Sequence, residues 1–190
     1  MARPRSEEKR RAILGAAVRG MVREGLGVST SDIAREAGVP HGSVFTYFET
    51  KGELWNAVYV ELREEMAKAA LKGLPPEGAT QNRFAGVWWD WMDWGVAHAE
   101  KRRVLAMLGA SGEITAKSGA AGEKAMAGMR ELLMRIHARG AMSAAPMGFV
   151  VAMVHSAAEG TMDCMAEVQD EASREKVCRA GFDAVLRMIG

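Results

Sequence analysis

The chain has few of the residues from which disulfides and metal sites are built. Its 190 residues include two cysteines, Cys164 and Cys178, and four histidines. Two cysteines this far apart form no CxxC pair and no disulfide framework, so we interpret them as small apolar side chains in a reducing compartment. The histidines form neither HxxxH nor HExxH. We therefore expect no metal site and no cofactor.

Long apolar runs and catalytic motifs are also missing. Hydrophobic residues make up 48% of the chain, yet no uncharged apolar run approaches the roughly 20 residues that a membrane-spanning helix needs. The start, MARPRSEEKRR, is charged with no apolar segment behind it, unlike a secretory leader. The sequence contains no GxSxG, GxGxxG or GxxxxGK[ST] motif. We expect a cytoplasmic protein that has no membrane partner and is not an enzyme.

The stretch Thr30–Lys51, TSDIAREAGVPHGSVFTYFETK, has the pattern of two short helices joined by a tight turn. Ala34, in its fifth position, is small enough for the two helices to touch, and Gly38 follows the first helix, where a left-handed conformation is needed. Apolar undersides are supplied by Ile33, Val39, Val44 and Phe48. Small or polar groups remain on the outside of the second helix, which has the size of a major-groove probe. The alternative is a surface helical hairpin without a nucleic-acid role.

Residues 37–54, AGVPHGSVFTYFETKGEL, closely resemble the DNA-binding signature of the TetR family of bacterial transcription regulators, and the resemblance covers roughly residues 10–60. In that family a glycine, an aromatic pair and a lysine close the recognition helix and open the next; here these are Gly42, Tyr47, Phe48 and Lys51. Together, pattern and resemblance give the expected DNA-binding residues: Thr30, Ser31, Pro40, His41, Gly42, Ser43, Thr46, Tyr47 and Lys51.

Charge is distributed unevenly, although the net charge is only +1. Residues 1–51 carry nine Lys and Arg against six Asp and Glu, whereas the remainder carries 16 against 18. With such a mild positive excess, one copy of the chain gains little DNA affinity by neutralising phosphates. We therefore expect two copies to bind one duplex. Residues 1–6 are interpreted as a basic arm that either reaches DNA or is disordered.

Helical periodicity continues along the rest of the chain, with no alternating strand pattern. The fold class is therefore all-α, with about nine helices: a three-helix helix-turn-helix domain at 1–50 and a ligand-binding and dimerisation domain at 51–190. Gly73–Thr80, with two prolines, is the clearest break, and 109–122 is a Gly/Ala/Ser-rich connection. The expected helices are 7–24, the two of the helix-turn-helix, 51–72, 84–97, 101–108, 124–139, 146–168 and 171–189.

Four of the five tryptophans lie within seven positions, at 88, 89, 91 and 94. In a helix, successive side chains are 100° apart, so the apolar side chains of 84–97 cover most of the helix circumference. Asp90 and Asp93 occupy the narrow part that remains. A helix of this kind is buried on most sides. Its indoles either belong to the core or form the wall of a cavity for flat apolar molecules, and the many methionines of 52–190 suit a surface that repacks around different guests.

Several segments, among them WMDWGVAH (91–98) and AAEGTMD (157–163), look similar to the RamR-type branch of the family. That branch consists of dimeric repressors of multidrug-efflux activator genes, which planar drugs or bile acids release from DNA. Val151 and Val154 stand where the branch has an acidic and an aromatic ligand contact, so a preference for cations is open. The resemblance and the aromatic and methionine pattern suggest these effector residues: Tyr59, Arg63, Met66, Trp88, Trp91, Leu105, Leu133, Phe149 and Met153.

The last two expected helices carry apolar residues and a run of small ones, Ser156-Ala157-Ala158-Glu159-Gly160, which permits close helix contact. By analogy with the family we expect them to form an isologous four-helix homodimer interface, although an intrachain core is the alternative. The resulting hypothesis is a dimeric, ligand-responsive repressor that binds a near-palindromic DNA operator and controls drug efflux. The alternatives are a similar regulator of a fatty acyl or signalling compound, and a helical binding module that does not contact DNA.

Overall fold

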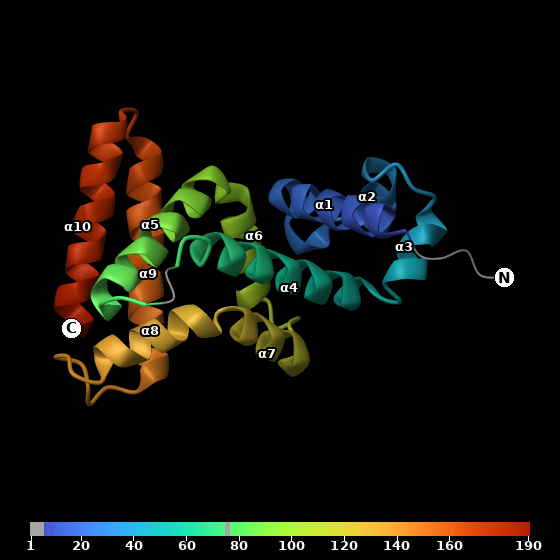
Figure 1. Cartoon of the computed structure of the whole chain (residues 1–190). Helices are drawn as coiled ribbons and strands as arrows, with labels where there is room; N and C mark the ends of the chain where they lie inside the picture. Colours follow the sequence, from blue (N-terminus) through green and yellow to red (C-terminus); the bar gives the residue numbers. More distant parts are fainter. Residues whose placement is uncertain (1–5, 75–76) are drawn as a thin grey trace. The chain divides into compact units, whose positions relative to one another are not determined.

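A computed structural model describes residues 6–74 and 77–190 (Figure 1). All regular elements in these two segments are helical, which confirms the all-α class. The elements are α1 (Glu7–Glu24), the 3-10 helix η1 (Gly25–Gly27), α2 (Thr30–Glu36), α3 (His41–Tyr47), α4 (Lys51–Ala70), α5 (Thr80–Ala97), α6 (Ala99–Ala110), α7 (Ala116–Ala125), α8 (Ala127–His137), α9 (Met147–Glu167) and α10 (Glu171–Ile189). None of these helices combines the length and the apolar character that a bilayer crossing requires.

The chain divides into two compact units, and the helix α4 contributes to both. Unit 1 comprises the residues up to Glu64 together with Ala99–Lys124, and unit 2 comprises Glu65–His98 together with Ala125–Gly190. The boundary expected at residues 50/51 separates a DNA-binding domain from a ligand-binding and dimerisation domain. It describes function and not compactness, and it stays a prediction. Residues 1–5 of the expected basic arm lie outside the described residues, as do the two prolines of the expected break after α4.

Unit 1 is built on the apolar face of α1. Ile13, Ala17 and Met21 are completely buried, and they share one core with Val44 of α3 and Leu108 of α6. In this core α1 packs against both α2 and α6. Helices α1, α2 and α3 form the N-terminal head of the chain. Their own residues do not make up its whole hydrophobic core, because buried side chains of α4 and α6 complete it.

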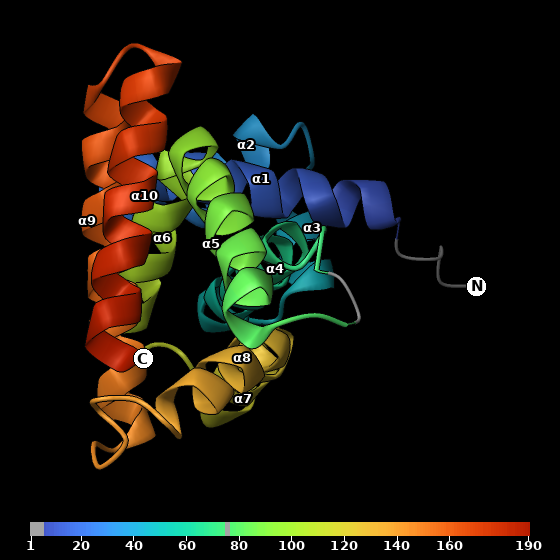
Figure 2. The same ribbon diagram turned by 60° about the vertical axis from the view of Figure 1, so that its left-hand side comes forward.

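Unit 2 consists of the end of α4, then α5, α8, α9 and α10. Helices α9 and α10 run side by side as a hairpin, and both pack on α5 (Figure 2). Two glycines allow these helices to approach closely, since a Cβ on Gly95 would collide with Met162 and one on Gly181 would collide with Thr161. Trp88 lies at the centre, completely buried between Phe84 and Phe182.

One helix was not expected from the sequence. Residues 109–122 were interpreted as a connection, yet α7 runs from Ala116 to Ala125. Alanine has the highest intrinsic helix propensity, but small residues leave no apolar stripe by which the period can be recognised. A Cβ on Gly122 would lie 3.0 Å from the Tyr59 ring and 3.3 Å from Arg63, so a side chain at this position would require these two residues of α4 to shift by a few tenths of an ångström.

Candidate nucleic-acid interface and effector residues

The turn between α2 and α3 has the geometry that the sequence pattern requires. Gly38 has φ +66°, in the left-handed region that favours glycine. The next amide, Val39 N–H, donates to the carbonyl of Ala34 at 3.0 Å, and Gly38 N–H donates to that of Arg35 at 3.2 Å. Ile33 and Ala34 are buried. The two short helices are therefore joined in a fixed geometry by backbone hydrogen bonds and apolar contact.

Helix α3 buries one side and exposes the other. Val44 is 1% exposed and Phe48, directly after the helix, is 5% exposed, so these two residues anchor it. Pro40, which directly precedes the helix, and three expected DNA-binding residues within it, His41, Gly42 and Thr46, are exposed, while Ser43 and Tyr47 are half-buried. The Thr46 hydroxyl donates to the Gly42 carbonyl at 3.1 Å, which leaves its oxygen lone pairs outward as acceptors. A short helix with an exposed row of small and polar side chains fits the major groove of B-DNA.

Two further expected residues lie beside this row, at the start of α2. Thr30 Oγ1 is 3.2 Å from His41 Nε2, so the structure brings the first residues of α2 and α3 together. Ser31 is exposed. The start of α2 therefore adds hydroxyl groups next to α3, of the kind that contact phosphate oxygens.

Phe45 was missed by the sequence interpretation. Its side chain is 43% exposed on α3, and its ring meets the His41 ring edge-on at 5.3 Å. A thymine methyl group is the base feature that an exposed apolar side chain can recognise in the major groove. The i, i+4 spacing between His41 and Phe45 is the signal that could have revealed it.

The aromatic pair and the lysine after it have defined roles in the fold. The Tyr47 hydroxyl accepts a hydrogen bond from the backbone N–H of Ser6 at 2.9 Å, which ties the start of α1 to the end of α3. The ammonium of Lys51 lies 5.2 Å from the centre of the Trp55 ring. Thr50 Oγ1 accepts from the amide of Glu53 at 3.0 Å, as expected for a capping side chain at the start of α4.

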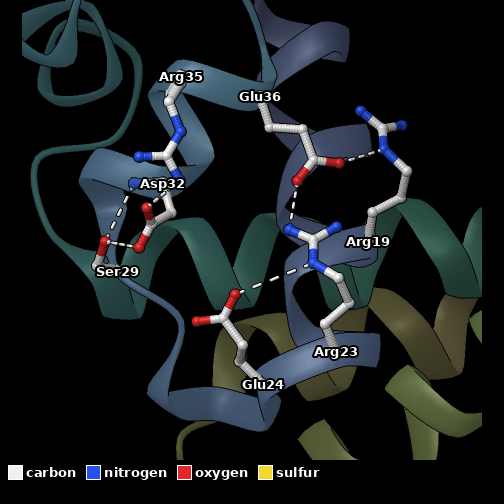
Figure 3. A network of polar contacts seen from close by, with 7 residues as sticks. All are labelled: Arg19, Arg23, Glu24, Ser29, Asp32, Arg35 and Glu36. Atoms are coloured by element: carbon white, nitrogen blue, oxygen red, sulfur yellow. Dashed lines mark hydrogen bonds and ion pairs between the residues drawn. The ribbon is translucent and has the colours of Figure 1, made fainter.

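Helices α1 and α2 are held together by a carboxylate that bridges two guanidinium groups (Figure 3). Glu36 on α2 accepts hydrogen bonds of 2.5 Å from both Arg19 and Arg23 on α1. Hydrogen bonding from Arg23, and then from Arg19, lowers the pKa of Glu36 from 4.5 to about 2. The bridge fixes the angle between α1 and α2, and thereby positions the helix-turn-helix on its support.

A second polar group joins Ser29, which directly precedes α2, with Asp32 and Arg35 of that helix (Figure 3). The amide of Asp32 donates to Ser29 Oγ at 3.0 Å, and the Ser29 hydroxyl donates to the Asp32 carboxylate at 2.5 Å. Arg35 forms an ion pair with the same carboxylate. The Ser29 hydroxyl, with help from Arg35, lowers the pKa of Asp32. Ser29 therefore caps the N-terminus of α2.

Three of the expected effector residues lie in unit 1. The guanidinium of Arg63 is 5.9 Å from the centre of the Tyr59 ring, and its terminal nitrogen reaches Glu123 on α7 at 3.5 Å. Arg63 Nε is buried and has no hydrogen-bond partner within the described segments. Leu105 is half-buried against the core of the unit. Tyr59 and Arg63 therefore form an aromatic and cationic pair beneath α7.

Five of the others lie in unit 2, and they fall into two groups. Met66, Trp88 and Leu133 are no more than 4% exposed, and the Trp88 indole N–H donates to the Cys178 carbonyl at 3.1 Å. Phe149 and Met153, in contrast, are 53% and 39% exposed on α9. The first group belongs to the packed interior, whereas the second faces outward from the single chain.

Trp91, the last of the expected effector residues, is 3% exposed. Its ring meets Trp88 edge-on at 6.1 Å and lies 6.2 Å from the His155 ring on α9. The indole N–H of Trp91 has no hydrogen-bond partner in the described part of the chain.

The other two tryptophans of α5 have partners on other helices. Trp89 lies under Arg179 at 5.7 Å, and the Trp94 indole N–H donates to Glu65 at 3.2 Å. Each of the four indoles of α5 thus has a different environment.

Open cavities occur in both units. One of about 740 Å³ in unit 1 is lined by residues of α4 and of the segment 113–118, and one of about 530 Å³ in unit 2 is lined by residues of α5, α9 and α10. None of the nine expected effector residues lines either cavity. In the second, burial raises the pKa of the Cys178 thiol to about 12, so this cysteine stays protonated and unreactive at neutral pH.

The helix-turn-helix segment matches a known family. Residues 13–58 match the model of the bacterial regulatory proteins of the tetR family. The matched span contains α2, α3, both arginines that bind Glu36, and the first turns of α4. The match thus covers the helix-turn-helix and the helices that support it, and leaves the rest of the chain unmatched.

Solved structures of that family have the same fold along the whole chain. A tetR-family transcription regulator of Shewanella sp. PV-4 aligns with a TM-score of 0.82 at 22% identity over 97% of this chain and 98% of its own. One from Marinobacter aquaeolei VT8 aligns at 0.81, with 19% identity over 94% and 95%. LfrR from Mycobacterium smegmatis, a TetR-like transcriptional regulator solved in complex with proflavine, aligns at 0.66, with 18% identity over 94% and 95%. The chain thus has the TetR-like fold, with an N-terminal helix-turn-helix followed by a helical domain.

Proposed function

We propose that the protein is a dimeric, ligand-responsive transcription regulator that represses its target by binding a near-palindromic operator. The observation that carries this proposal is the outer face of α3. Val44 and Phe48 are buried and anchor this helix, and the Glu36 bridge holds α1 and α2 together beside it. Most polar side chains of α3 are nevertheless exposed. The match of residues 13–58 to tetR-family regulatory proteins supports a DNA-binding role for this face.

The contacts on DNA follow from the chemistry of each side chain. His41, Ser43 and Thr46 offer donors and acceptors for base edges, and Phe45 offers an apolar face for a thymine methyl. Lys51 and the hydroxyls at the start of α2 bind phosphate oxygens, which sets the position on the duplex. Two such heads in successive major grooves require half-site centres about 34–36 Å apart, or a multiple of that distance.

The subunit surface of the proposed homodimer is the outer side of the α9–α10 hairpin. Phe149 and Met153 are the two large apolar side chains that α9 leaves exposed, and Ser156 and Gly160 continue the same surface with small groups. An isologous contact would bury these residues against their copies. This placement assigns Phe149 and Met153 to the dimer surface, and the interior residues of unit 2 to effector binding.

The proposed effector is a small apolar or planar aromatic molecule, as expected for control of drug efflux in the cytoplasm. The proflavine complex of LfrR, which has the same fold, supports a planar aromatic ligand. The buried aromatic residues Trp88 and Trp91 of unit 2 suit such a molecule. The effector would release the operator by binding more tightly to a conformer whose two heads have the wrong separation, and only that difference in affinity can shift the equilibrium.

Titration of DNA from immediately upstream of the protein's own gene tests this function. The native chain should bind that duplex at least about 1,000-fold more tightly than a scrambled duplex of the same length at one fixed salt concentration. The His41→Ala/Thr46→Ala double variant should lose this preference and keep its helical circular dichroism spectrum. Equal binding of both duplexes by the native chain would contradict the proposal and favour a helical binding module that does not contact DNA.

A further inference from the structure

The indole N–H of Trp91 is a donor that the fold does not use. Trp91 is 3% exposed, and its Nε1 atom is buried without a hydrogen-bond partner among residues 6–74 and 77–190. Its neighbours on the same helix differ in this respect. Trp88 donates to the Cys178 carbonyl at 3.1 Å, and Trp94 donates to the Glu65 carboxylate at 3.2 Å.

A buried donor without a partner carries a cost that most protein structures avoid. At least about nine in ten buried polar groups are hydrogen-bonded. An unmade bond weakens the state that contains it by roughly 5- to 100-fold in an equilibrium constant. Packing alone would not require this donor, because a phenylalanine ring could contact Trp88 and His155 without a polar atom. The donor is therefore available for a group that does not belong to the chain.

We propose that the effector presents a hydrogen-bond acceptor to Trp91 Nε1. This inference rests on the proposed function and specifies the chemistry of its ligand. An indole nitrogen can only donate, so its partner must carry a lone pair: a carbonyl, ether, carboxylate or phenolate oxygen, or an unprotonated ring nitrogen. A flat hydrocarbon, or a cation whose nitrogens all carry protons or carbon substituents, leaves the donor unpaired. The effector is thus a planar apolar molecule with an acceptor at its edge.

Arg63 provides an independent observation of the same kind in the other unit. Its Nε is also buried and unpaired in the part of the chain that the structure describes, and it too can only donate. Both side-chain nitrogens that are buried without a partner in the described residues belong to expected effector residues. Each of these donors, considered within its own unit, calls for an acceptor and not for a cation.

A pair of tricyclic probes tests the inference. Fluorene and 9-fluorenone have nearly the same size and flatness, but only the ketone has an acceptor oxygen. Their dissociation constants would be measured by calorimetry on the full-length native protein, on Trp91→Phe and on Trp94→Phe. The last variant is the matched control, because it removes a buried indole donor of the same helix whose partner is Glu65.

We expect the native protein to bind 9-fluorenone roughly 5- to 100-fold more tightly than fluorene. Trp91→Phe should bind both compounds equally, while Trp94→Phe should keep the preference for the ketone. Equal binding by the native protein, a ketone preference that survives in Trp91→Phe, or no binding of either probe would each overturn the inference. An ordered water on Nε1 with two further bonds to the protein in a crystal structure would overturn it too.

Operator binding, measured in parallel, separates this inference from the function on which it rests. If the upstream duplex is bound and both probes release it equally, the regulator stands and only the acceptor requirement is lost. If the native protein does not prefer the upstream duplex in the absence of probe, the proposed function itself fails.

Discussion

Replacing Glu36 by glutamine tests the bridge between α1 and α2. The substitution keeps the size of the side chain and removes the charge that two guanidinium groups share. Glu36 is 22% exposed as a side chain, while Arg19 and Arg23 are 53% and 51% exposed. The carboxylate is thus sheltered, and its partners are half in water.

The magnitude follows from the pKa of Glu36, which falls from 4.5 to about 2 on folding. A shift of that size corresponds to at most roughly 3.5 kcal/mol of stability, at about 1.4 kcal/mol per pKa unit. Solvent screening of the half-exposed arginines reduces the expected value to about 1 kcal/mol. For a chain of this size that loss lowers Tm by about 2–4 °C.

The pH dependence has a definite sign. Because folding lowers this pKa, the native chain binds fewer protons at Glu36 than the unfolded chain. The stabilisation is complete above pH 4.5 and is lost as the pH falls towards 2. Glu36→Gln should therefore be less stable than the native chain at pH 7, and the difference should shrink below pH 4.5.

Urea unfolding at pH 7, 5, 4 and 3 measures both effects. Glu131→Gln is the matched control, since Glu131 forms an exposed i, i+4 ion pair with Arg135 on one helix, and it should change stability by less than about 0.5 kcal/mol. If Glu36→Gln and the native chain unfold at the same urea concentration at every pH, the bridge does not stabilise the head and this reasoning is refuted.

Three further substitutions test other parts of the account. Lys51→Ala should lower the slope of log affinity against log salt concentration by about one unit, because one phosphate contact is lost. Anisotropy titrations measure this slope, and an unchanged slope would show that Lys51 does not contact DNA. Gly38→Ala should lower the free energy of unfolding in urea by about 1 kcal/mol. The cost comes from the backbone, because φ is +66°, while a Cβ at this position would meet no atom within 4 Å. An unchanged stability would contradict the need for glycine at the turn. Trp88→Ala should cost about 3–5 kcal/mol in urea unfolding, because the ring is completely buried, and a change below about 1 kcal/mol would contradict its place in the core of unit 2.

The head could be predicted from the sequence because local chemistry specifies it. Gly38 has the expected positive φ, Val44 and Phe48 are buried as expected, and most of the expected polar residues of α3 are exposed. These features depend on residues a few positions apart. The partnership of Glu36 with Arg19 and Arg23 depends on how two helices cross, which no pattern of neighbouring residues reveals.

The second part of the chain was less accessible to prediction. Its helices were recognised from their apolar period, except for α7, whose alanines and glycines have none. The arc of tryptophans correctly predicted a largely buried α5, but periodicity could not separate the roles of its indoles. Whether an indole nitrogen has a partner depends on distant residues, such as Cys178 for Trp88, and only the structure shows this.

Base recognition by the exposed side chains of α3 is the property on which the proposed function depends. Its most direct test is the ratio of affinities for the upstream duplex and for a scrambled duplex, compared between the native chain and Thr46→Ala at one salt concentration. We expect the variant to bind the upstream duplex more weakly by roughly 5- to 100-fold, the cost of one base contact, while its affinity for the scrambled duplex stays the same. An equal loss on both duplexes, or no loss on either, would contradict base recognition by this helix.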